Sequence, residues 1–225
     1  MLMTRIHWFD LEREKTMYTI RRNYVKVISF LTIISGIIVY LIRFQLCQQA
    51  VSVGVVAAAG SNVITLTAIL WLFWNSFFWK IPHLLCISGV PNLSGRWKGH
   101  YKRNDPSSDG KEHGYVLEIK QTYSSIQCTT YQDNGTSSAG IVSELCTLSD
   151  QRTCLVFHWG GTRTSDERSK ELRPIYHGLT RVTYSKAVSG KPATLTGDYF
   201  TDQGTNGHVN LQFEQRPLLE RFTVE

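Results

Sequence analysis

The 225 residues suffice for one medium domain or for a small domain plus a further segment. The formal net charge of +6 is unevenly spread: residues 1–91 hold eight Lys or Arg and three Asp or Glu, a net +5, and the remainder is nearly balanced. A nucleic-acid polymer is therefore excluded as the expected partner, because its binders concentrate positive charge on the folded domain. The five cysteines, an odd number without a C-x-x-C pair, exclude a disulfide framework and a structural zinc site.

The first apolar stretch, Val27 to Ile42, carries no charge and is bracketed by Lys26 and Arg43. As a helix it would span roughly 24 Å, which is short of the ~30 Å hydrocarbon core, and snorkelling of the two flanking cations supplies the difference. A cleaved signal peptide would start nearer to the N-terminus and would not be followed at once by a second apolar run. We therefore expect a transmembrane helix after a basic segment over residues 1–25.

The second uncharged run, residues 44–79, is long enough for a short turn and a complete second span, which we place at about Ser52–Phe73. The two transmembrane helices together would occupy residues 26–79. Aromatic residues at the end of this run, among them Trp74 and Trp79, are typical of an interfacial aromatic belt beside the membrane.

Small residues recur along the second span. Gly54, Ala58 and Asn62 lie four residues apart and would share one helical face. Small side chains let helices approach closely, and the Asn62 amide can hydrogen-bond across such an interface. This face is therefore a candidate for oligomerisation between chains, with packing of the two spans within one chain as the alternative.

The distribution of basic residues predicts the orientation in the membrane. Most Lys and Arg of the N-terminal region precede the first span, and the connection between the spans offers only Arg43. Because positive charge stays inside, and because two spans return the chain to its starting side, we expect both termini to be cytoplasmic. A reducing compartment also suits the unpaired cysteines.

A neck linker over residues 80–92 leads into a C-terminal region whose short alternating runs are typical of strands. The expected domain covers residues 93–216 and is followed by a tail, 217–225. Eight strands joined by tight turns predict an all-β, up-and-down antiparallel barrel, whose interior is the default binding site. The predicted strands are Ser94–Lys102, Tyr115–Thr122, Ser125–Tyr131, Ile141–Leu148, Thr153–Trp159, Tyr176–Tyr184, Ala193–Phe200 and Gly207–Phe213, with one helical turn at Asp166–Leu172.

The opening strand alternates Gly95, Trp97, Gly99 and Tyr101 on one face, which fits a tapering barrel interior. Its glycine-x-tryptophan element resembles the first strand of lipocalin-like barrels. We favour Trp97 as a plug at one barrel end over Trp97 as a ligand contact.

A polar-aromatic hairpin closes the domain. In the run Leu195–Asp202, the side chains of Tyr199 and Thr201 would point the same way as Gly197. A glycine beside an inward tyrosine leaves space for a flat group such as a base, and the alternative is that the aromatics fill the core.

The two spans, the neck, the LSGRWKGHY strand and the LTGDYFTDQGTNGHV hairpin together resemble the two-transmembrane β-strand-rich effectors of CBASS antiphage defence. These are membrane proteins associated with CD-NTase nucleotide cyclases. The resemblance implies a multi-pass protein of the bacterial inner membrane whose barrel binds a cyclic dinucleotide made by the cyclase. It further implies that the ligand drives oligomerisation and membrane disruption, so that the infected cell dies. The chain departs from the family pattern at Gln203, where a basic residue is common.

The chemistry of a cyclic dinucleotide, with flat bases and two phosphates, selects candidate ligand contacts in the domain. The aromatic rings of Tyr131, Trp159 and Tyr199 are stacking candidates, and Thr201 and Asp202 could bond base edges. Arg181 is the candidate for an inward cation. Three further cations are either ligand contacts or residues of a solvated outer face, namely Arg96, Lys98 and Arg163. For Arg96 and Lys98, strand parity opposite to Trp97 favours the outer face.

Three other functions remain open at this stage. An enzyme is not expected, since the chain has no nucleophile elbow, zinc-protease pair or phosphate loop. No cofactor or metal is expected either: the seven histidines are scattered, and although His158, His177 and His208 lie in predicted strands and could converge, a lone histidine in a strand is more often a core or surface group. A membrane-tethered carrier of a lipid or other apolar ligand would need a wholly apolar cavity. A structural anchor would have a barrel filled with side chains.

Overall fold

The computed structural model describes residues 24–42, 53–104, 110–148, 152–162 and 175–223. The chain divides into two compact units, one comprising residues 1–92 with Thr122–Ser124 and the other comprising residues 93–121 with 125–225. Most of the predicted basic N-terminal segment, the predicted helical turn Asp166–Leu172 and the candidate cation Arg163 lie outside the described residues.

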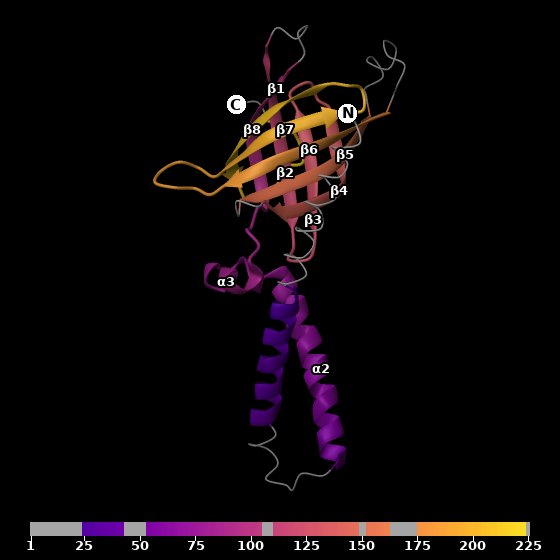
Figure 1. Ribbon diagram of the computed structural model, residues 1–225, viewed down its shortest axis with the longest axis vertical. Coiled ribbons are helices and arrows are strands. Elements are labelled where there is room, and N and C mark those ends of the chain that lie inside the picture. The colour runs from indigo at the N-terminus through magenta and orange to yellow at the C-terminus, as the bar shows by residue number, and fades with distance from the viewer. Residues whose placement is uncertain (1–23, 43–52, 105–109, 149–151, 163–174, 224–225) are drawn as a thin grey trace. The chain divides into compact units, whose positions relative to one another are not determined.

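The helical unit contains a first helix, Tyr24–Ile42, and α2, Val53–Ser76, which are followed by the short helices η1 (Phe78–Lys80), η2 (Pro82–Leu84) and α3 (Leu85–Ser88) (Figure 1). Among the described residues, Tyr24–Ile42 is the one helix found long and apolar enough to cross a membrane. Helix α2 carries no Asp, Glu, Lys or Arg. The prediction of two transmembrane helices is thus supported for the first helix and not confirmed for the second.

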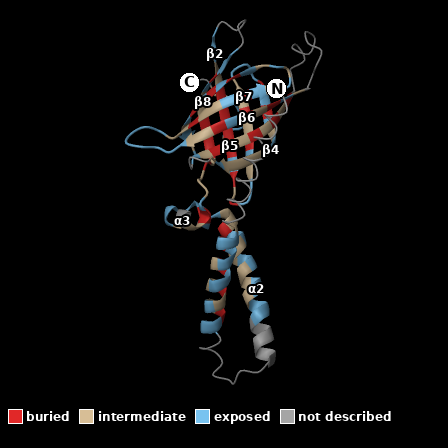
Figure 2. Cartoon of the chain, viewed as in Figure 1, coloured by how far each residue is buried: buried red, intermediate tan, exposed pale blue. Residues whose placement is uncertain are grey.

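The first helix and α2 pack against each other along one side. Val27 and Leu31 of the first helix are buried, and Ser35 Oγ lies 3.1 Å from Thr67 Oγ1 of α2. A hydroxyl pair of this kind holds two apolar helices together where lipid supplies no hydrophobic driving force. Much of the first helix and of the described part of α2 is exposed, in pale blue in Figure 2, and the exposed residues include the apolar Ile33, Ile37, Ile64 and Leu72.

The positions singled out for oligomerisation all fall within α2. Asn62 is exposed, whereas the structure describes the backbone but not the side-chain surroundings of Gly54 and Ala58. Their role in self-association therefore stays a prediction.

An aromatic cluster lies at the end of α2, around Tyr123. The Tyr123 ring contacts Trp71, Trp74 and Trp79 at centroid distances of 5.8, 6.1 and 6.4 Å, and its backbone N–H donates to Asn75 O at 3.1 Å. Trp74 and Trp79 are almost completely buried in this cluster. The cluster with Tyr123 therefore covers the rings of these two residues, and their place in an interfacial aromatic belt stays a prediction.

The second unit is a closed antiparallel barrel in which each strand pairs with the next and β8 returns to β1 (Figure 1). This confirms the predicted eight-stranded up-and-down barrel. The strands are β1 (Gly95–Arg103), β2 (Glu112–Gln121), β3 (Ile126–Gln132), β4 (Ser137–Thr147), β5 (Thr153–Thr162), β6 (Ile175–Ser185), β7 (Thr194–Thr201) and β8 (Asn206–Gln215).

Side chains of alternate residues fill the part of the barrel where β1 begins. Trp97 is 1% exposed, its Nε1–H donates to Leu93 O at 2.9 Å, and its ring meets Tyr184 and Phe213 edge to face. Leu117 and the other aliphatic residues of the core surround it. Trp97 therefore plugs this end of the barrel, as the sequence predicted, and the opposite mouth is the place for a site.

β4 differs from its predicted extent, because it starts at Ser137 rather than at Ile141. Ser137, Ser138 and Ala139 pair with β3, and the register then shifts between Gly140 and Val142. This bulge leaves two successive residues, Ile141 and Val142, strongly exposed. The alternation of inward and outward residues is therefore interrupted here, and it could not indicate that the strand starts before Ile141.

A buried ion-pair network, here called the C-terminal clasp, lies on the outer face of the barrel where β8 meets β1. Arg96 donates from Nη1 to Glu118 Oε1 at 2.8 Å and from Nε to Glu214 Oε2 at 2.6 Å. It also donates to Arg221 O at 2.8 Å and to Thr223 Oγ1 at 2.9 Å. The expectation that Arg96 is solvated is wrong, because the C-terminal residues cover its outward side chain completely.

Candidate functional site

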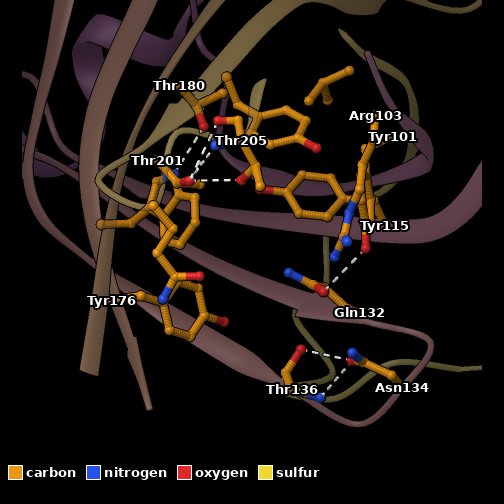
Figure 3. A pocket seen from close by; sticks show the side chains of 14 residues that line it. Tyr101, Arg103, Tyr115, Gln132, Asn134, Thr136, Tyr176, Thr180, Thr201 and Thr205 are labelled. Atoms are coloured by element: carbon orange, nitrogen blue, oxygen red, sulfur yellow. Dashed lines mark hydrogen bonds between the residues drawn. The ribbon is translucent and has the colours of Figure 1, made fainter. Parts of the chain in front are cut away.

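A cavity of about 290 Å³ opens at the barrel mouth opposite Trp97 (Figure 3). Fourteen described residues line it: four tyrosines, four threonines, three amides, one tryptophan, one arginine and one valine. They are Tyr101, Arg103, Tyr115, Gln132, Asn134, Thr136, Trp159, Tyr176, Thr180, Tyr199, Thr201, Gln203, Thr205 and Val209. This lining is polar and aromatic, and none of these residues is acidic.

The cavity has a neutral interior and a cationic mouth. Tyr115, Trp159 and Thr180 are buried, and Trp159 Nε1–H donates to Thr180 Oγ1 at 2.9 Å. Arg103, the last residue of β1, and Asn134, in the turn between β3 and β4, are exposed. An anionic group of a ligand is thus met by positive charge at the entrance and by hydroxyl and ring groups further inside.

Glycines on neighbouring strands make room for the aromatic side chains. A Cβ built on Gly178 would overlap the Trp159 indole, one on Gly207 would lie 2.6 Å from the Tyr199 ring, and one on Gly161 would lie 2.7 Å from Tyr176. Such distances are far below van der Waals contact, so a side chain at any of the three positions would displace a ring that lines the cavity. The absence of side chains at these three positions therefore determines where the lining rings lie and how much volume remains in the cavity.

The hydroxyl groups of the cavity form few hydrogen bonds with one another. Thr201 Oγ1 lies 2.6 Å from Thr205 Oγ1 and accepts from Thr205 N at 3.2 Å, which fixes the β7–β8 turn. The hydroxyl of Tyr101 is 3.4 Å from Gln132 Oε1. The hydroxyl of Tyr199 is buried, lies close to the Arg103 guanidinium and makes no hydrogen bond of good geometry within the described structure.

Burial raises the pKa values of Tyr101, Tyr115 and Tyr199 above the ordinary value of 10.0, and the nearby positive charge of Arg103 offsets part of the rise for Tyr101 and Tyr199. The three phenols are therefore neutral at physiological pH. A neutral phenol can donate a hydrogen bond to a phosphate or a base edge, whereas a phenolate would repel the phosphate.

We expect the free energy of unfolding to fall as the pH rises above about 10, because unfolded tyrosines then ionise while the buried phenols stay protonated. Tyr115, the most deeply buried of these phenols, should contribute most to this loss. Thermal unfolding between about pH 8 and 11 measures the effect. Tyr115→Phe should flatten the alkaline decline, and an unchanged slope in this variant would contradict the assignment.

The structure brings three of the predicted ligand residues together at the cavity, namely Trp159, Tyr199 and Thr201. It places the other three elsewhere. Tyr131 lies on the outward face of β3, opposite in parity to buried Thr130, and Asp202 Oδ1 accepts from His177 N at 3.2 Å within a turn.

The prediction that Arg181 faces the interior is wrong. Its neighbours Thr180 and Val182 are buried, so Arg181 points outward and is exposed. Lys98 likewise occupies the outward face of β1, as strand parity favours.

The sequence reasoning missed the cation at the mouth and most of the tyrosines. Arg103 shares the inward row of β1 with Trp97 and Tyr101, which is the signal that could have identified it. Gln132, Asn134 and Thr136 surround the β3–β4 turn, where Asn134 Oδ1 accepts from Thr136 N at 3.0 Å and from Thr136 Oγ1 at 2.6 Å.

The family model of the Cap15 cyclic dinucleotide receptor domain matches residues 88–215, which is more than half of the chain and includes all eight strands. The chain belongs to this family. The resemblance to CBASS effectors is thereby confirmed, and the barrel is the Cap15 receptor domain for a cyclic dinucleotide. No curated protein matches the chain.

The geometry of the Cap15 barrel also bears on the alternative functions. A lipid carrier needs an aliphatic cavity, whereas Val209 is the sole aliphatic residue among those that line this one. A filled anchor is contradicted by the cavity itself. Of the scattered histidines, His158 and His177 stack at 5.5 Å, and His208 Nδ1 lies 3.1 Å from Asp198 Oδ1.

Proposed function

We propose that this Cap15 protein is a membrane effector in which a cyclic dinucleotide, bound in the barrel mouth, drives self-association and disruption of the bacterial inner membrane. Infected cells would then die before phage spread. The observation that carries this proposal is a hollow mouth lined by aromatic rings and hydroxyls, with Arg103 at its entrance and no acidic group among its described residues. The proposed role is that of a non-catalytic receptor without a cofactor.

The ligand chemistry fits this lining. Aromatic side chains such as Trp159 and Tyr176 can stack on bases, at about 1–3 kcal/mol per base. A guanidinium such as that of Arg103 forms charge-assisted hydrogen bonds to a phosphate. The upstream partner is accordingly a CD-NTase cyclase that supplies the cyclic dinucleotide.

The membrane part of the proposal rests on the two apolar helices. Tyr24–Ile42 has the length and composition of a span. The uncharged α2, whose apolar residues are exposed beyond the helix–helix contact, supports a second crossing. With the basic N-terminal residues inside, both termini and the barrel would lie in the cytoplasm.

Self-association is supported by an apolar row on the outer face of the barrel. Val142 pairs with His158, His158 with Leu179, and Leu179 with Phe200, so that the row crosses four strands. Val142 and Phe200 are 63% and 55% exposed. Exposed apolar patches of this kind mark interaction sites, and a second copy of the chain is the proposed partner, together with the Gly54, Ala58 and Asn62 face of α2.

The ligand can drive assembly only if it binds the assembled state more tightly than the dispersed state. We expect a panel of cyclic dinucleotides, titrated against the full chain in lipid nanodiscs or detergent, to include one that binds and enlarges the particle. Calorimetry measures the binding, and light scattering measures the size.

Phe200→Lys separates the two steps, because it charges the outer row and leaves the cavity unchanged. This variant should bind the ligand with unchanged affinity and fail to assemble, and it should not kill cells that also express the cyclase. The proposal is wrong if no cyclic dinucleotide binds to the full chain, or if binding leaves particle size and membrane permeability unaltered.

A further inference from the structure

We propose that the cavity encloses one half of the cyclic dinucleotide: one nucleobase enters the neutral interior, the phosphates stay at the mouth beside Arg103, and the second nucleotide projects from the barrel. This inference rests on the proposed function and specifies how the site takes its ligand. Two features of the cavity carry it, namely its volume and its distribution of charge, and the buried hydroxyl of Tyr199 offers a partner for the edge of the base.

The volume limits how much of the ligand can enter. The cavity measures about 290 Å³, whereas cavities that bury most of a drug-sized ligand range from roughly 300 to 1,000 Å³. A cyclic dinucleotide carries two nucleosides on a rigid sugar–phosphate ring and is at least as large as such a ligand. Trp97 and the aliphatic core occupy the rest of the barrel, so the cavity cannot deepen without displacing the plug.

The charge distribution determines which part of the ligand enters. The interior groups, among them Tyr115, Trp159 and Thr180, are neutral and buried. A phosphate placed among them would lose its hydration without gaining a cation, which is strongly unfavourable. Arg103, the sole cation among the described lining residues, lies at the exposed mouth. The uncharged base is therefore the part of the ligand that suits the interior.

A partner for the base edge is already in place. The hydroxyl of Tyr199 is buried, with the whole residue 8% exposed; it lies close to the Arg103 guanidinium and makes no hydrogen bond of good geometry in the described structure. A phenol can both donate and accept, as can the edge of a nucleobase. The Tyr199 ring lies over Gly207 of β8, where an added Cβ would come within 2.6 Å of the ring, so this glycine makes room for the tyrosine.

The test uses the tightest unmodified cyclic dinucleotide from the panel and two derivatives of it, with a bulky dye on one nucleotide or on both. Binding to the full chain in nanodiscs is measured by competition. We expect the singly labelled ligand to bind within about tenfold of the unmodified one, because the labelled half can project. The doubly labelled ligand should bind at least about 100-fold more weakly, since neither base can then enter.

Two outcomes would overturn the inference while leaving the proposed function intact. If a single dye prevents binding, the ligand is enclosed completely. If two dyes have no effect, no base enters the cavity. By contrast, failure of every unmodified cyclic dinucleotide to bind would contradict the proposed function itself.

Two variants test the assigned positions of the ligand groups. Arg103→Gln should weaken binding by about tenfold and reduce its dependence on salt, because an exposed charge–phosphate contact is screened by ions. Tyr199→Phe keeps the ring and removes the hydroxyl, so it should weaken binding by about tenfold with its salt dependence unchanged. If both variants lose the salt dependence of binding equally, Tyr199 also contacts a phosphate. The phosphate would then lie in the interior, and the proposed orientation would be wrong.

Discussion

Replacing Gly178 with alanine is expected to weaken cyclic dinucleotide binding by at least about tenfold while the barrel still folds. The added Cβ would lie 2.5 Å from Cε2 of Trp159, and this indole is anchored by its hydrogen bond to Thr180. The ring must therefore shift within a cavity of about 290 Å³, where it competes with the ligand for space. Overpacking of this kind costs about 1–3 kcal/mol of stability, which a barrel of this size can tolerate.

Gly160→Ala is the matched control for this substitution, since Gly160 also sits in the same sheet but faces outward. Its added Cβ would meet the His177 ring at 3.3 Å and Ile141 at 3.4 Å, and neither residue lines the cavity. Calorimetric titration of both variants, with circular dichroism to confirm folding, makes the comparison. Equal affinities in the two variants would show that Trp159 does not limit the site.

Arg96→Met should lower the free energy of unfolding by about 3–5 kcal/mol, the usual cost of removing one partner from a buried ion pair. Arg96 is completely buried, and its removal leaves the carboxylates of Glu118 and Glu214 without the cation that pairs with both of them. Two donors to Glu118 remain, the backbone N–H groups of Leu219 and Glu220, at 2.8 and 3.1 Å. These two N–H groups still bind the C-terminal residues to Glu118, but they carry no net charge and cannot neutralise the two carboxylates.

Lys98→Met provides the control for the Arg96 substitution, because Lys98 is a half-buried cation two residues further along the same outer face of β1. A surface cation of this kind contributes no more than about 1 kcal/mol. Chemical denaturation of both variants measures the difference. If the two lose similar stability, the C-terminal clasp does not secure the junction of β1 and β8.

The alternation of the sequence was sufficient to predict eight strands and their closure into a barrel. It also placed Trp97 at the plugged end, because large aromatics and glycines shared one face of the first strand. It could not predict the start of β4, since the bulge at Ile141 exposes two successive residues. Nor could it foresee that Trp74 and Trp79 are buried by Tyr123, which is distant in sequence.

The binding site was only partly predictable for a similar reason. Trp159, Tyr199 and Thr201 stood out as an aromatic-polar pattern and do line the cavity. Arg181 was misplaced because it shares the outer face of β6 with Leu179, whereas Thr180 and Val182 are the buried residues on either side of it. For Arg96, strand parity gave the correct face, but parity does not reveal that a distant tail covers it.

The closure of β8 onto β1 limits how these molecules can polymerise. Every strand of the barrel has a hydrogen-bonded neighbour on each side, so the described barrel has no edge strand, although β4 pairs with β3 only through Ser137–Ala139. If these chains assemble as proposed, we expect contacts between side-chain faces rather than a continuous cross-β ribbon, and a single charged substitution can disrupt such a face. Infrared amide bands should therefore stay constant while particles enlarge, and the growth should be reversible once the ligand is removed.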